Sequence, residues 1–412
     1  MPPEDEPDWT EAVYGTPYEI KVHMADNPPL FAWAEYENAL MEGNKEYLKE
    51  LLYDRGVLQK HYEWIESLTE SRELPDTVLK RKNNLIAEKY GYKWEGGCSG
   101  MDNTPRGRTG EKANCVRPNN PNMLWIDAIC QQALSARSIS KLFAILDDEK
   151  SAKIWNERYE EKKQIVNELY WDKRDEFYYD IDCETHDFYK VMTIASFWTL
   201  TAEIADKKQA EALVKQVSNP ETFGGFVPLV SLSRSDSDYC KDGVYWRGAM
   251  WLPTAYATLK GMANYGFYRE AHDAAWKILE HMQKTYAEFE PHSIWECYSP
   301  EEHKPAHNEH SGDGAGYVRK DFCGWSALGP ISVYIEFVLG FHTINAFEKT
   351  VKWAKPEEFS EKIGIKNLHF ADIVTDIVAD KNICTVNSTG EYTLEINGQK
   401  YEISEGENTI TL

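Results

Sequence analysis

The chain has 412 residues, of which 42% are apolar and 27% charged, as is typical of a folded protein with a sizeable core. Its formal net charge is −23 and its pI about 5.0, which argues against nucleic acid or anionic membrane as partners, because both select a basic face. No apolar run reaches the length of a membrane span. The 14 tryptophans and 24 tyrosines suit sugar binding, and a large aromatic core is the alternative that composition leaves open.

Residues 1–28 are polar and have little periodicity, so we expect an irregular lead-in. The opening MPPEDEPDWTEAV is acidic and rich in proline, whereas a secretory signal is basic and then apolar. We therefore expect a cytoplasmic protein if the chain is complete, and a periplasmic or secreted one if a signal or an N-terminal domain has been removed.

Helical periodicity begins near Asn27 and continues in segments separated by three irregular stretches, 74–122, 220–244 and 290–323. The helices are predicted over 30–44, 44–71 with a break near Gly56, 123–148, 150–172, 188–206, 207–219, 245–266, 268–289 and 324–342. On the helix 268–289, Trp276 and Leu279 fall at positions expected to lie in the core.

These helices come in pairs, and the long irregular stretches fall between pairs. This arrangement predicts an all-α fold, an (α/α)6 barrel over residues 29–350, with its loops gathered at one end. A six-pair barrel needs about twelve helices, slightly more than the pattern shows.

The C-terminal segment differs from the rest of the chain. Residues 383–412 alternate apolar and polar side chains, and Asn397-Gly398 is a hairpin turn signal. We expect a small antiparallel β appendage over 366–412.

Each irregular stretch carries one cluster in which a charged side chain stands beside large apolar or aromatic residues. Loops that serve only solubility do not concentrate tryptophan beside single charges. The clusters are Asp102 in SGMDNTPR, then Trp246, Arg247 and Trp251 in YWRGAMW, then Trp295 and Glu296 in WECYSP with Trp325 beyond.

Two carboxylates from loops far apart in sequence suggest an acid and base pair. Hydrolysis of a glycosidic bond needs one acid at the leaving oxygen and one carboxylate that activates water or attacks carbon. Asp102 and Glu296 are the candidates. The alternative for each is a merely structural loop carboxylate.

Several segments, in order, resemble glycoside hydrolase family 63, which comprises inverting α-glycosidases, and more distantly the family 37 trehalases. The resemblance covers about 30–342, and the combination is specific although each piece alone is not. The segments are NPPLFAWA (27–34), SGMDNTPR (99–106), LWIDAICQQAL (124–134), YWDKRDEFYYDID (170–182), YWRGAMW (245–251), WECYSP (295–300) and FCGWSAL (322–328).

The resemblance implies an (α/α)6 barrel, with Asp102 as general acid and Glu296 as general base. It also implies an oligosaccharide or disaccharide substrate with an α-linked glucose or a related sugar. The substrate-binding residues that follow from it are Trp33, Asn103, Arg106, Asp127, Trp246, Arg247, Trp251 and Trp325.

The sequence departs from the family pattern in three places. Cys98 stands where relatives commonly have a glutamate, just before SGMDN. The N-terminal β-sandwich that usually precedes the barrel is missing from this sequence, and the stretch after WECYSP is longer and rich in histidine. The first departure bears on substrate preference and activity.

Three histidines in that stretch, His303, His307 and His310, suggest a metal site, because positions 303 and 307 share a face on a helix. Pro305 and the missing helical pattern favour a solvated loop instead. We therefore expect no metal, and no organic cofactor either, because hydrolysis is acid–base chemistry.

Two other function classes compete with the hydrolase. A catalytically impaired relative would bind carbohydrate without cleaving it, and the presence of both Asp102 and Glu296 argues against this. A terpene cyclase or prenyltransferase needs metal-diphosphate or zinc motifs, which the sequence lacks. For the hydrolase we expect inversion, with the two carboxyl groups about 6.5–9.5 Å apart.

Overall fold

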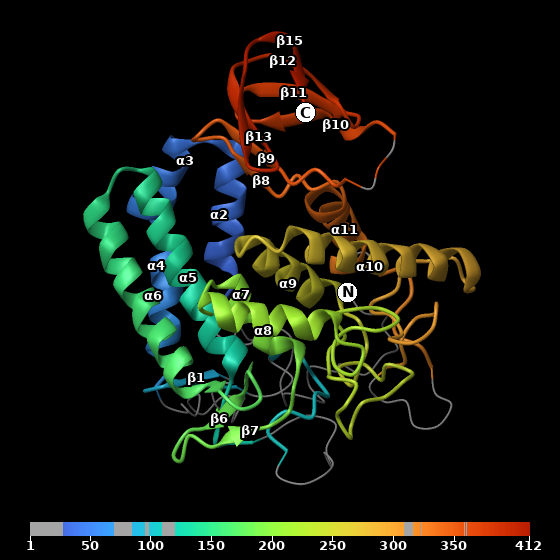
Figure 1. The fold of residues 1–412 in the computed structure, drawn as a ribbon. Helices are drawn as coiled ribbons and strands as arrows, with labels where there is room; N and C mark the ends of the chain where they lie inside the picture. Colours follow the sequence, from blue (N-terminus) through green and yellow to red (C-terminus); the bar gives the residue numbers. More distant parts are fainter. Residues whose placement is uncertain are drawn as a thin grey trace, which may run out of the picture.

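The protein is described here from a computed structural model (Figure 1). The structure describes residues 28–69, 85–94, 99–108, 120–308, 316–322, 324–357, 359 and 361–412. The expected lead-in therefore lies outside the described residues, except for Pro28. In the described ranges, no helix combines the length and the apolar character that crossing a bilayer requires.

An arc of inner helices forms the centre of the molecule. α5 is buried along almost its whole length because apolar and small residues occupy every face, as expected for a helix enclosed by others. α5 packs against α2 and α7, α7 against α9, and α9 against α11. These helices are α2 (Phe31–Glu42), α5 (Ile126–Ile145), α7 (Trp198–Thr201), α9 (Leu252–Asn264) and α11 (Trp325–Val333).

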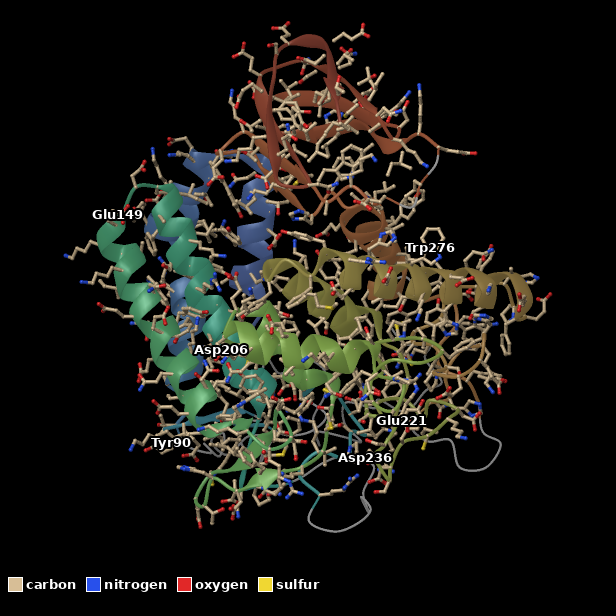
Figure 2. All side chains as sticks on the ribbon, viewed as in Figure 1. Tyr90, Glu149, Asp206, Glu221, Asp236 and Trp276 are labelled. Carbon is tan, nitrogen blue, oxygen red and sulfur yellow. The ribbon has the colours of Figure 1, made fainter. Side chains whose placement is uncertain are left out.

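Outer helices cover this arc, and each buries only one stripe. On α6, alanine and aromatic residues at helical spacing face inward, whereas Glu149 and other charged side chains point outward (Figure 2). Asp206 begins α8 with a reciprocal capping box to Gln209. The outer helices are α4 (Val57–Glu66), reached through α3 (Lys45–Lys49) and η1 (Glu50–Arg55), then α6 (Glu149–Leu169), α8 (Lys207–Ser218) and α10 (Tyr268–Glu288).

The described arc runs from α2 to α11 and is shorter than the predicted ring of six pairs. After α11 the chain continues through η4 (Tyr334–Val338) directly into strand β8, where the pattern of pairs would place an outer helix. Leu328 of α11 is accordingly 68% exposed. The predicted helix 188–206 is also shorter, because its first residues pair as a strand and Ile194–Phe197 (η3) form a 3₁₀ turn before α7.

The helical part is not purely α, which corrects the all-α prediction. Short strands connect the helices at the end opposite the C-terminal β unit (Figure 1). Such pairings of only two to four residues leave no periodicity for sequence reasoning to detect. They are β1 (Leu85–Glu88), β2 (Gly91–Trp94), β3 (Met123–Leu124), β4 (Trp171–Asp172), β5 (Phe177–Tyr178), β6 (Asp180–Asp182) and β7 (Phe188–Tyr189).

The C-terminal β unit contains two four-stranded sheets, ordered β10-β11-β12-β15 and β14-β13-β9-β8, which share one hydrophobic core. The predicted hairpin turn is present at Asn397-Gly398, where both residues have positive φ. The strands are β8 (Thr343–Asn345), β9 (Thr350–Trp353), β10 (Ile363–Phe370), β11 (Ile373–Ala379), β12 (Ile383–Ser388), β13 (Tyr392–Ile396), β14 (Gln399–Ile403) and β15 (Gly406–Thr411).

This unit begins earlier than the predicted boundary at residue 366. The apolar core of the helices ends at Val338, and that of the β unit begins at Leu339. β9 joins the unit through a parallel pairing with β13, about forty positions later in the chain, as the register Thr393 to Thr350 shows. A pairing over such a distance has no local sequence signal.

One core prediction on α10 is wrong. Trp276 is 48% exposed, and its ring packs at the surface against Phe359 and His272 (Figure 2). Helical spacing places Trp276 near the buried stripe, but a tryptophan at the edge of such a stripe keeps one face in solvent. Leu279, one turn further, is partly buried as expected.

Candidate active site

The loop 99–108 presents one acid from an otherwise buried turn. Residues 101–107 are buried except Asp102, whose side chain remains partly accessible. Gly100 and Gly107 both have positive φ, and a Cβ at Gly107 would lie 2.8 Å from Sδ of Met123. The glycines therefore allow a tight turn that closes on β3 and leaves Asp102 pointing out of it.

Arg106 anchors this loop from behind. Its guanidinium is buried and donates to both oxygens of Asp127, at 2.8 Å each, and to both oxygens of Asp180, at 2.8 and 2.6 Å. It also lies 4.3 Å from the centre of the Trp125 ring. Burial opposes the charge, but the two carboxylates outweigh burial and raise the pKa of Arg106. Arg106 and Asp127 thus hold the loop against the start of α5, and both are closed off from solvent.

Asn103 joins the loop to the turn at 244–247. Its Oδ1 accepts from the backbone N–H of Trp246 at 2.8 Å, and its Nδ2 donates to the carbonyl of Val244 at 3.1 Å. Nε of Arg247 donates to the backbone carbonyl of Asn103 at 3.1 Å. Neighbours of Asp102 and residues of YWRGAMW, about 140 positions apart, therefore form one rigid unit.

Glu296 lies on the other side of this turn. Its side chain is buried, and its Oε1 accepts a 3.0 Å hydrogen bond from the hydroxyl of Tyr245. Its backbone carbonyl accepts from Ser326 Oγ at 2.8 Å and from Trp325 Nε1 at 3.3 Å. Hydrogen bonds therefore hold both the side chain and the backbone of Glu296.

Tyr245 lies close to both candidate acids. Burial raises the pKa of its phenol, and the charges of Glu296 and Asp102 raise it further. The geometry agrees with this: Asn103, next to Asp102, is hydrogen-bonded to Val244 and Trp246, and Tyr245 between them donates to Glu296. The loop that carries Asp102 therefore lies against the turn that holds Glu296. With its pKa raised, the phenol stays protonated and can donate to Glu296.

The aromatic wall has a buried and an exposed part. Trp246 and Trp251 stack with ring centres 4.2 Å apart and both are buried, whereas Trp325, 6.1 Å from Trp251, is 43% exposed. Trp251 also donates to the carbonyl of Tyr245 at 3.2 Å. Among the predicted tryptophans in this group, Trp325 has the ring most open to a ligand.

Trp33, the remaining predicted tryptophan, lies elsewhere. It is on α2, where Nε1 donates to Oε1 of Glu37 at 3.1 Å and the ring packs edge-on against Trp198. It lines a cavity that contains neither Asp102 nor Glu296. The structure therefore does not bring Trp33 together with the two acids.

Two residues of the site were missed in the sequence. Tyr245 is the first letter of YWRGAMW, but no local signal distinguishes its hydroxyl from those of the other tyrosines. Arg108 forms ion pairs of 2.6 Å with Asp236 and with Asp238, and Asp238 also lies 3.6 Å from Arg247. The run SRSDSD holds these acids, although only the fold shows which arginines they face.

The histidine stretch does not assemble a metal site in the described residues, which hold no group of three or more candidate ligands placed to bind one ion. His303 contacts His281 with Nδ1 atoms 3.0 Å apart, and His307 packs on Tyr317. Residues 98 and 310, which entered the sequence arguments, lie outside the described residues.

Residues 4–313 match the protein family described as "Mannosylglycerate hydrolase MGH1-like glycoside hydrolase domain". The chain belongs to this family. The match covers about three quarters of the sequence and confirms the resemblance to glycoside hydrolase family 63.

Relatives in sequence are longer than this chain. An uncharacterized protein of Borreliella burgdorferi is 28% identical over 358 residues, which are 86% of this chain and 67% of that protein. The mannosyl-oligosaccharide glucosidase of Saccharomyces cerevisiae is 28% identical over 301 residues, 66% of this chain and 33% of that protein. A mannosylglycerate hydrolase of Rubrobacter radiotolerans is 27% identical over 153 residues, 36% of this chain and 33% of that protein.

Solved structures support the fold. A chain named "Sialidase" superposes with a TM-score of 0.65 at 16% identity, over 94% of this chain and 31% of that chain. A family 63 mannosylglycerate hydrolase from Thermus thermophilus, in complex with Tris, superposes with a TM-score of 0.51 at 17% identity, over 75% of this chain and 76% of that chain.

Proposed function

We propose that this protein is an inverting glycosidase that cleaves α-linked glucosides or related α-glycosides. Asp102 is the general acid and Glu296 the general base. We also propose that the arc of paired helices is a variant of the (α/α)6 barrel. The observation that carries the proposal is the hydrogen-bonded link between the segments of the two acids: Asn103, next to Asp102, bonds to the turn at Val244–Trp246, and Tyr245 in that turn donates to Glu296. This link lies within a domain that belongs to a glycoside hydrolase family.

The reaction needs one proton delivered and one removed. Asp102 protonates the glycosidic oxygen as the bond to the anomeric carbon breaks. Glu296 takes a proton from a water that attacks the same carbon from the opposite face, so that configuration inverts without a covalent intermediate. Each cycle consumes one water. It leaves Asp102 deprotonated and Glu296 protonated, and proton exchange with solvent restores both groups for the next cycle.

Tyr245 supports the role of Glu296 as base. Its hydrogen bond occupies Oε1 and leaves Oε2 for the water. Because the phenol remains protonated, Tyr245 donates in this bond and orients the carboxylate. Tyr245 is thus a positioning residue.

The aromatic residues provide the binding surface for the sugar. The exposed ring of Trp325 is suited to stack on a pyranose face. Arg106, Asp127 and Asn103 act behind this surface by holding the loops.

The test is hydrolysis of a panel of aryl α-glycosides and α-linked disaccharides. Asp102→Asn and Glu296→Gln should each abolish turnover while thermal unfolding stays unchanged, and Glu149→Gln on the exposed start of α6 is the matched control. Full turnover in either active-site variant would refute the assignment. Sugar binding without turnover in the unmodified protein would instead favour a carbohydrate-binding protein.

A further inference from the structure

A cavity lies inside the arc, away from the two acids. Its volume is about 600 Å³, within the range of about 300–1,000 Å³ that small-molecule sites occupy. α5, α9 and α11 each begin beside the segments that carry or hold the two acids. At these helix starts Trp125 contacts Arg106, Trp251 contacts Tyr245 and Trp325 contacts Glu296. The cavity lies among their later residues, such as Lys141, Lys260 and Ile331. It therefore faces the opposite end of the arc.

The β unit forms one wall of this cavity. Thr343 and Lys352, on β8 and β9, contribute side chains, and Ile365 and Leu368 on β10 complete the wall. In Figure 1 the β unit and strand β6, which anchors the Asp102 loop through Asp180, lie at opposite ends of the helices. A molecule in the cavity would thus touch both the helical arc and the β unit.

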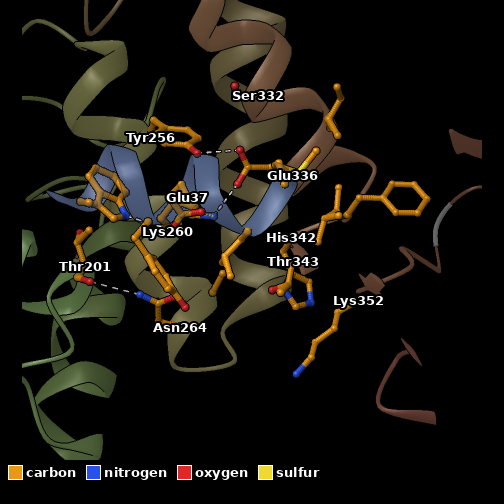
Figure 3. Close-up of a pocket in the computed structure, with 18 of the residues that line it drawn as sticks. Glu37, Thr201, Tyr256, Lys260, Asn264, Ser332, Glu336, His342, Thr343 and Lys352 are labelled. Carbon is orange, nitrogen blue, oxygen red and sulfur yellow. Dashed lines mark hydrogen bonds and ion pairs between the residues drawn. The ribbon is translucent and has the colours of Figure 1, made fainter. Parts of the chain in front are cut away.

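One side of the cavity carries a partly buried charge network. Nζ of Lys260 lies 3.2 Å from Glu37 and 2.9 Å from Glu336, and the hydroxyl of Tyr256 donates to Glu336 at 2.7 Å (Figure 3). Burial opposes the charge of Lys260, but the two glutamates raise its pKa overall. This side therefore presents carboxylate oxygens with an excess of negative charge.

The other side carries an excess of donors. Arg137 and Lys141 share the single carboxylate of Glu203, with Lys141 at 3.6 Å. Lys352 also faces the cavity, and within the described chain it forms no ion pair. Over the whole lining, four lysine and arginine side chains face three glutamates, so that the charges almost balance. Apolar side chains make up the larger part of the remaining lining, which is therefore mixed in character.

The chemistry selects the class of ligand. An apolar molecule would leave these charges buried without water, which is costly. A strongly charged ion would meet charges that almost balance. A neutral polyol suits the mixed lining, because its hydroxyls donate to the glutamates and accept from lysine and arginine. Aromatic side chains, among them Trp33, Tyr256 and Tyr268, also line the cavity and suit its C–H groups.

We propose that this cavity is a second carbohydrate site, which takes a neutral mono- or disaccharide and braces the β unit against the helices. The site is independent of the proposed hydrolysis, because it contains neither Asp102 nor Glu296. A ligand bound only by the folded protein raises its thermal stability by mass action. Saccharide binding here should therefore stabilise the chain even when the catalytic acid is removed.

The experiment uses the full chain with Asp102→Asn, so that the sugar is not consumed. Glucose, mannose and trehalose are titrated in turn by calorimetry and by thermal unfolding. Thr343→Trp fills the cavity, and Thr343→Val is the matched control that removes only a hydroxyl. We expect at least one sugar to bind, Thr343→Trp to weaken that binding at least about tenfold, which is about 1.4 kcal/mol, and Thr343→Val to retain it.

Hydrolysis by the protein with Asp102 intact should be unchanged in both Thr343 variants, which separates this site from the proposed active site. If Thr343→Trp does not fold, Lys352→Met replaces it, because that change removes one donor at similar length and should weaken binding alike. Sugar binding that neither variant alters, or no binding of any of the three sugars, would overturn the proposal.

Discussion

The hydroxyl of Tyr245 donates a 3.0 Å hydrogen bond to Oε1 of Glu296, and the charge of Asp102 acts on the same phenol. This contact ties the first residue of YWRGAMW to the acid of WECYSP, 51 positions later. In the proposed mechanism it also orients Glu296 so that one oxygen remains for water.

Tyr245→Phe tests this contact. Loss of a hydrogen bond to a charged group is worth about 1.5–3 kcal/mol, so kcat should fall about 10- to 100-fold with little change in KM. Tyr47→Phe is the matched control, since it removes a tyrosine–glutamate bond of the same length on α3. Unchanged kcat in Tyr245→Phe would show that the hydroxyl does not position the base.

Trp325→Ala should raise KM with little effect on kcat. Its exposed ring offers about 0.5–1.5 kcal/mol of stacking, equivalent to about a two- to tenfold change in KM. Glu296 should stay in place without the indole of Trp325, because Ser326 also donates to the backbone carbonyl of Glu296, at 2.8 Å. Trp325→Phe, which keeps a ring, should restore most of the affinity. Trp276→Ala, at a similarly exposed site, is the control, and a change in KM there equal to that of Trp325→Ala would refute stacking.

Arg106→Met should destabilise the fold severely. Asp127 and Asp180 would remain buried without their cation, which costs about 3–5 kcal/mol. Denaturant unfolding measures the loss, with the exposed Arg55→Met as control. A loss below that of the control would mean that solvent reaches the two carboxylates, contrary to their burial.

Stability should fall on acidification because of buried histidine. Burial, with a smaller contribution from His303, lowers the pKa of His281 to about 3, whereas an unfolded histidine titrates near about 6.5. Above about pH 6.5 both states are neutral and stability is complete. Below it the unfolded chain binds the proton first, so the free energy of unfolding declines by about 1.4 kcal/mol for each pH unit down to about pH 3.

His281→Phe should remove the contribution of this residue to the decline of the free energy of unfolding with falling pH. Denaturant unfolding measured between pH 7 and pH 4 checks this. His342, whose pKa burial lowers to about 4, should keep a second, similar contribution in the variant. The exposed His292→Phe is the control and should leave the slope as it is. An identical slope in His281→Phe would contradict the buried neutral state of that ring.

The strongest sequence signals were local ones. The predictions for 123–148, 150–172 and 268–289 correspond to α5, α6 and α10 within a few residues, because these segments are long and strongly periodic. Asp102 and Glu296 stand out as candidates because each is a single acid in an apolar or aromatic setting, within a segment that resembles a family motif, and their roles stay a prediction.

The remainder depends on contacts between distant residues. Arg106 was expected to bind substrate, but Asp180, 74 positions away, helps to bury it in an ion network. Trp33 was expected to bind substrate because it lies in the family segment NPPLFAWA, but its position on α2 places it in the cavity away from the two acids. Neither outcome has a signal in the neighbouring sequence, since both follow from which helices pack together.

The anomer formed first is the most direct test of the two-acid mechanism. Proton NMR during the first turnovers of an α-glycoside, before mutarotation, identifies it. A general acid and a general base separated by a water predict the β-anomer as the first product. The α-anomer would require a covalent intermediate and would contradict the role assigned to Glu296.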